Sequence, residues 1–157
     1  MSQESNDVFD SIEKHIQKFG WGIVSFEEDK PLYVTSVGLH KTLSFPEIVI
    51  FGLPVEISHR IINSIGLQLK NGRVIKKRTP YTDIIEDYKV MFLEIDRKKR
   101  RPYFDLVEDF YEDNKVPVVQ MIWSDEANHL PWEEGFDTNL VPIQPVLNID
   151  VMRLGIV

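Results

Sequence analysis

Apolar residues recur at helical spacing in three stretches, which cover residues 7–19, 54–71 and 103–112. Asn6 or Asp7 stands at the N-cap position of the first stretch. Pro54 opens the second and Gly72 follows it, which matches the preference of proline for the first helical position and of glycine for the position after a helix. These patterns predict three amphipathic helices.

Shorter apolar runs predict strands over residues 21–26, 32–39, 47–53, 88–95 and 116–123, and residues 143–149 are a candidate for one more. The first two are separated by a charged turn, so we expect them to form a hairpin. The run Glu47 to Leu53 is the most apolar of the chain, which predicts a central strand at the core.

The predicted elements do not alternate strictly between strand and helix. We therefore expect an α+β fold with a mixed or mainly antiparallel sheet, either open or curled into a split barrel, and about three helices packed outside. The chain has no internal repeat and no long linker, so we expect one domain over residues 1–157, with its ordered core at about 7–150.

Composition excludes several classes of protein. Without cysteine there is no disulfide, no thiolate nucleophile and no cysteine metal site. The N-terminus carries polar and acidic residues where a secretory signal needs a basic stretch and an apolar run. No apolar run approaches the roughly 20 residues that span a bilayer. We therefore expect a cytoplasmic protein that does not cross a membrane.

The charges are unevenly distributed. A net charge of −7 argues against general binding of nucleic acid, which depends on neutralising phosphates with Lys and Arg. Residues 66–101, however, hold eleven basic and five acidic side chains, and residues 102–137 hold one basic and ten acidic ones. The basic region offers a surface to an anion unless the two regions face each other or are simply solvated.

Two segments carry side chains suited to an anionic ligand. Thr35 and Ser36 place hydroxyls at the end of a predicted strand and His40 follows them, although hydroxyls are also common in half-exposed strands. His59 and Arg60 lie near the start of the second predicted helix, where unpaired N–H groups attract anions. Structural capping is the more common role of such a segment, Glu56 already occupies the first turn, and no phosphate-loop glycine pattern is present.

A third segment combines aromatic and polar residues, namely Gln120, Trp123, His129 and Trp132. Such a mixture is typical of small-molecule pockets, and equally of a loop held to the core by a large ring. No metal site is expected, because the histidines lack a dense ligand motif. No catalytic residue can be assigned, because a nucleophile elbow is missing and serine adjoins histidine only at Ser58-His59.

Four blocks of sequence carry a family resemblance. They are Phe19-Gly20-Trp21, Thr35 to Leu39, Pro46 to Pro54, and Gln120 to Asp125 with Leu130 to Glu133. Together they resemble the bacterial family of domain of unknown function 4262 (DUF4262) over about residues 7–147. The family implies no activity. Its members often have histidine where this chain has Phe45, so the resemblance implies no histidine-dependent role at that position.

The hydroxyl-bearing strand, the loop with Pro46 and the apolar strand that follows are also similar to the FMN-binding split-barrel flavin reductases. That resemblance implies FMN as cofactor, with Thr35, Ser36 and His40 on its phosphate side and Trp132 near its ring.

Three functions therefore remain open. The first is the binding of a small anionic or nucleotide-like ligand, as a metabolite sensor or, in a phage or mobile element, as a sink for a signalling nucleotide. The second is a flavin-dependent oxidoreductase. The third is an interaction or immunity-type module that binds a partner through its acidic surface. Homo-oligomers are compatible with all three.

Overall fold

The computed structural model describes residues 3–154 and contains one six-stranded mixed sheet. The strands are β1 (Gly22–Phe26), β2 (Tyr33–Val37), β3 (Glu47–Phe51), β4 (Tyr81–Ile85), β5 (Tyr88–Glu94) and β6 (Val118–Trp123). Their order is β1-β2-β3-β6-β5-β4, and only the β3–β6 pair is parallel. The expected α+β class and mixed sheet are confirmed, and the sheet is open, with β1 and β4 at its edges.

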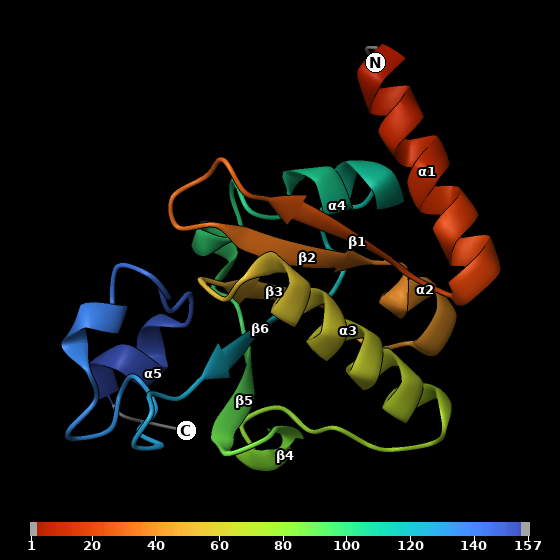
Figure 1. The fold of residues 1–157 in the computed structure, drawn as a ribbon. Coiled ribbons are helices and arrows are strands. Elements are labelled where there is room, and N and C mark those ends of the chain that lie inside the picture. The colour runs from red at the N-terminus through yellow and green to blue at the C-terminus, as the bar shows by residue number, and fades with distance from the viewer. Residues whose placement is uncertain (1–2, 155–157) are drawn as a thin grey trace.

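Within residues 3–154, five α-helices accompany the sheet (Figure 1). They are α1 (Gln3–Phe19), α2 (Leu39–Leu43), α3 (Val55–Lys70), α4 (Asp105–Tyr111) and α5 (Ile149–Leu154), with 3₁₀ turns η1 (Arg97–Lys99) and η2 (Thr138–Leu140). No helix in the described part of the chain is both long and apolar enough to cross a bilayer.

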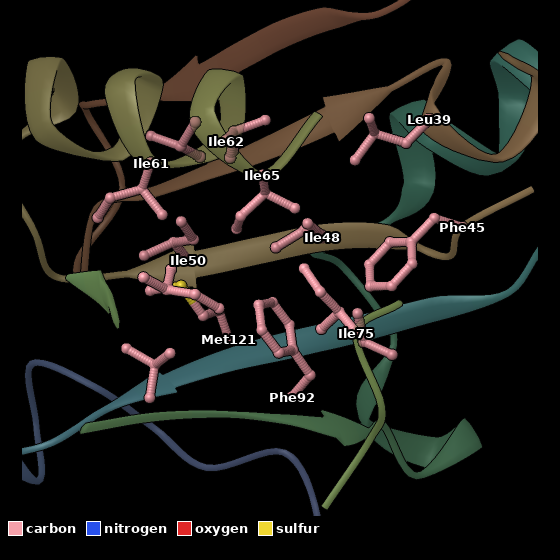
Figure 2. Close-up of a cluster of buried hydrophobic side chains, with 14 of the residues drawn as sticks. Leu39, Phe45, Ile48, Ile50, Ile61, Ile62, Ile65, Ile75, Phe92 and Met121 are labelled. Atoms are coloured by element: carbon pink, nitrogen blue, oxygen red, sulfur yellow. The ribbon is translucent and has the colours of Figure 1, made fainter. Parts of the chain in front are cut away.

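Successive side chains of each strand point to opposite faces of the sheet, so each face has its own hydrophobic core. On one face of the sheet, α3 packs Ile61, Ile62 and Ile65 onto β3, β5 and β6, as Figure 2 shows. On the other face, α1 and α4 cover β2 and β3. The segment after β6 covers β5 and β6 on this second face through Leu130 and Val151. Burial of these apolar surfaces is the main stabilising contribution.

Several sequence predictions need correction. The first helix begins at Gln3, so Asn6 and Asp7 lie inside it and neither is its N-cap. Pro54 is the N-cap of α3 and not its first helical residue. Residues 39–43 form α2, because Gly38 adopts φ +112° and turns the chain out of the sheet.

The remaining corrections concern the second half. Residues 81–85, which carried no strand prediction, form edge strand β4 with only Ile84 buried. The candidate strand at 143–149 is wrong, since this segment is irregular and leads into α5. Arg100 belongs to the basic run 97–101, but its side chain is only 13% exposed, because its guanidinium pairs with Glu108 at 3.4 Å and donates to the carbonyl of Val116.

Candidate functional site

The hydroxyl and N–H groups at the end of β2 surround an anion, and that anion belongs to the protein. The carboxylate of Glu47 is fully buried. Its Oε1 accepts from Ser36 Oγ at 2.7 Å and from the N–H of Leu39 at 3.3 Å. Its Oε2 accepts from the N–H groups of Gly38 at 2.8 Å and His40 at 3.2 Å. The start of α2 therefore offers its unpaired donors to Glu47.

Tyr111 of α4 completes this cluster. Its hydroxyl donates to Glu47 Oε2. Burial, together with the adjacent carboxylate, raises the pKa of the Tyr111 phenol well above its ordinary value. Among the described residues no cationic side chain forms an ion pair with Glu47. Hydrogen bonds alone stabilise this carboxylate, which links β2, α2, β3 and α4.

The predicted ligand residues at 35–40 therefore lie in a structural cluster. Thr35 and Ser36 are fully buried, and Ser36 Oγ also accepts from the N–H of Ile48 at 2.9 Å. The His40 ring lies edge-on to Tyr111, with 5.9 Å between centroids. The sequence reading overlooked Glu47, although an acidic residue that opens the most apolar run of the chain signals a buried carboxylate with internal donors.

A groove of about 580 Å³ runs between α1, the start of β1 and α3, and we call it the α1–α3 groove. Its described lining contains four basic side chains and no Asp or Glu. The lining residues are His15, Lys18, Phe19, Trp21, Gly22, Ile23, His59, Asn63, Leu67 and Lys70.

The floor of the α1–α3 groove is held in place by side-chain contacts. The indole N–H of Trp21 donates to Asn63 Oδ1 at 3.0 Å. The Trp21 ring packs on Gly66 of α3, where an added Cβ would overlap it. His59 Nε2 lies 2.9 Å from Ser25 Oγ on β1. These contacts hold polar groups at defined positions beside the exposed Phe19 ring.

Sequence reasoning found only His59 of this groove. Arg60 is exposed one position further along α3 and does not line it. His15, Lys18 and Lys70 carried no site prediction. Their convergence depends on how α1 packs beside α3, which helical periodicity does not predict.

The predicted aromatic segment lies at the other end of the sheet. A cavity of about 680 Å³, which we call the strand-end cavity, opens beyond the last residues of β3 and β6. Trp123 lines it, and its indole N–H donates to the carbonyl of Phe51 at 2.8 Å. Gln120 holds the C-terminal segment instead, donating to the carbonyl of Pro145 and accepting from the N–H of Leu147.

Asp125 organises the loop around this cavity. Its Oδ1 accepts from the N–H groups of Ala127 and His129, and its Oδ2 from the N–H of Asp137 and from His129 Nδ1 at 3.2 Å. Burial on its own would raise the pKa of Asp125, but these donors hold it below its ordinary value. Trp132 packs with Leu130 against the core and does not line the cavity, which is the contact expected of a loop pinned by a large ring.

The acidic region forms a third hollow, the acidic groove, along α4. Its lining contains five carboxylates, from Asp105, Glu108, Asp109, Glu112 and Asp113, beside Phe9, Arg101 and Asn114. Part of the acidic region does face the basic one, since Lys89 pairs with Glu133, Arg100 with Glu108 and Arg101 with Asp105. Within residues 3–154 no group of three or more His, Asp or Glu side chains is arranged to hold a metal ion.

Fold and grooves thus define a small α+β protein with an open mixed sheet and separate basic and acidic surfaces. The chain belongs to the family described as domain of unknown function (DUF4262), whose profile matches residues 15–137. This confirms the resemblance carried by the four sequence blocks. Comparison with curated proteins and with solved structures finds no match.

Proposed function

We propose that the protein binds a small anionic, nucleotide-like ligand in the α1–α3 groove. The observation that carries the proposal is the charge of this groove. Lys18, Lys70, His15 and His59 line it, and no described acidic residue does, although the protein as a whole has a net charge of −7. A site with one sign of charge attracts the opposite ion even when the net charge does not.

The groove also suits the uncharged part of such a ligand. Phe19 and Leu67, each 55% exposed as a residue, give it apolar walls. Binding sites for small molecules combine such walls with a few fixed polar groups. Asn63 is one of these, because the Trp21 indole holds its Oδ1 and so orients its amide N–H₂ as a donor. A phosphate beside the lysines and a ring against Phe19 match this arrangement.

The flavin alternative has less support. The resemblance that suggested it assigns Thr35 and Ser36 to the flavin phosphate, and both are fully buried, with Ser36 already donating to Glu47. His40 is the accessible member of that set. An absorption spectrum of protein purified without added ligand tests this alternative, because retained flavin colours the protein yellow.

Isothermal titration calorimetry with AMP, and with adenosine as the uncharged comparison, tests anion binding. The double variant Lys18→Gln/Lys70→Gln should weaken AMP binding about tenfold, since each exposed charge contributes up to about 1 kcal/mol. A matched control, Lys98→Gln/Lys99→Gln, removes two exposed lysines of η1, outside the groove, and should leave AMP affinity unchanged. Equal weakening in both variants, or equal affinity for adenosine, contradicts the proposal.

A second candidate function rests on the acidic groove. Five carboxylates along α4 favour a partner protein with a basic surface. Binding through these charges should weaken steeply with added salt, because exposed charges are screened over about 10 Å at 0.1 M ionic strength. A partner whose affinity is insensitive to salt, or unaffected by Asp109→Asn/Glu112→Gln, excludes this surface.

A further inference from the structure

The strand-end cavity lies beyond the parallel neighbours β3 and β6, where the chain segments that follow the two strands turn to opposite faces of the sheet. After β3 the chain turns into α3 on one face, and after β6 it continues into a segment whose Leu130 and Val151 cover the other face. Such a divergence opens a crevice beyond the carboxyl ends of the strands, and ligands of open sheets with parallel strands bind in crevices of this kind.

The walls of the cavity are apolar and aromatic. Ile57 of α3 and Tyr88 of β5 line it beside Trp123. The Trp123 ring is fixed, because its N–H donates to the carbonyl of Phe51. The Tyr88 ring is only partly buried, so it is accessible from the cavity. Aromatic faces attract cations through their quadrupole.

The charged groups of the cavity all have the same sign. Asp125, Glu126 and Asp137 line it, and no described Lys, Arg or His does. Asp125 is occupied by donors of its own loop. Glu126 and Asp137 are exposed, and Asp137 uses only one oxygen, Oδ1, to accept from the N–H of Asn139. Carboxylate oxygens therefore remain accessible at the rim of an apolar hollow.

From this complementarity we infer that the strand-end cavity binds a small organic cation, a protonated amine attached to an apolar or aromatic body. The body lies against Ile57 and Tyr88, and the ammonium group lies at the rim near Glu126 and Asp137. The same chemistry disfavours an anion, so this site and the α1–α3 groove select ligands of opposite charge.

Three probes with the same phenyl body separate this inference from simple hydrophobic binding. Phenethylammonium carries the cation, 2-phenylethanol is neutral and 3-phenylpropionate is an anion. Titrations followed by amide chemical shifts should show phenethylammonium shifting the resonances of residues 123–127 and 135–137. The neutral probe should bind about fivefold more weakly, and the anion more weakly still.

Charge variants complete the test. Glu126→Gln/Asp137→Asn keeps the size of both exposed side chains and should weaken phenethylammonium binding about fivefold. Glu27→Gln/Glu28→Gln, which removes two exposed charges from the β1–β2 loop, should not change it. Lys18→Gln/Lys70→Gln should not weaken it either, so this result is independent of anion binding in the groove. Absence of shifts at millimolar phenethylammonium, equal affinity for the three probes, or unchanged affinity in the cavity variant overturns the inference.

Discussion

Replacing Glu47 with glutamine tests whether the buried carboxylate stabilises the fold. Glutamine has almost the same size, but it offers one acceptor oxygen in place of two and adds an N–H₂ group. The five donors around Glu47 divide into two at Oε1 and three at Oε2. The amide oxygen should therefore take the Oε2 position, where it keeps the N–H groups of Gly38 and His40 and the hydroxyl of Tyr111.

The hydrogen bonds that are lost are then those made to Oε1. The N–H of Leu39 loses its acceptor there, and an unsatisfied buried donor costs about 1–3 kcal/mol. Ser36 must turn its hydroxyl to accept from the new N–H₂ group, and the remaining bonds lose the extra strength that a charged acceptor gives. Together these losses predict a decrease of about 3 kcal/mol in the free energy of unfolding, or about 6–12 °C in Tm for a chain of this size.

Urea denaturation followed by circular dichroism measures this change, with Glu28→Gln in the exposed β1–β2 loop as the control, which should unfold like the wild type. A double-mutant cycle with Tyr111→Phe should give a coupling of only about 0.5–1 kcal/mol, because glutamine keeps the hydrogen bond from the Tyr111 hydroxyl and loses only the extra strength of a charged acceptor. Removing a buried charge also relieves its desolvation cost. A Glu47→Gln variant as stable as the wild type, or more stable, would show that this cost exceeds the hydrogen bonds and would refute the reasoning.

Three further substitutions have expected outcomes. Gly66→Ala should destabilise the protein by about 2 kcal/mol and shift the Trp21 fluorescence, because the new Cβ overlaps the indole; unchanged emission contradicts this contact. Gln144→Leu should cost about 2 kcal/mol in urea unfolding, since it removes both hydrogen bonds to the backbone of Trp123. Asp125→Asn should make the free energy of unfolding decrease less steeply as the pH is lowered into the acid range. A lowered pKa in the folded state contributes stability above the ordinary pKa of 3.8, and this stability is lost as pH falls through the folded-state value. If the variant loses stability at acid pH as steeply as the wild type, Asp125 does not have this stabilising role.

The predictable part of the fold is the part that local pattern determines. The helix α3 and the strand β3 have strong periodicity or a long apolar run between clear breakers, and both lie where the sequence indicates. Strand β4 was missed because an edge strand with a single buried residue carries little apolar signal. Helix α2 was missed because it follows from the positive φ of Gly38 and from the capping carboxylate of Glu47, which lies on another strand.

The site was less predictable because it depends on residues that are far apart in sequence. Ser36 was expected to contact a ligand, and the hydrogen-bonding capacity inferred for it is present, but the partner is Glu47. His59 lines the α1–α3 groove as part of a set with Lys18 and Lys70, which come from different helices. Nothing in the local sequence of α1 indicates that its basic side chains face those of α3.

Amide and indole chemical shifts during an AMP titration test the central proposal most directly, because they report where the ligand binds as well as whether it binds. If the α1–α3 groove is the site, the largest shifts should come from the Trp21 indole N–H, the Asn63 side-chain amide and the backbone N–H of Gly22, all of which line it. Shifts concentrated at residues 36–40 or 123–137, or no shifts at millimolar AMP, would contradict the proposal.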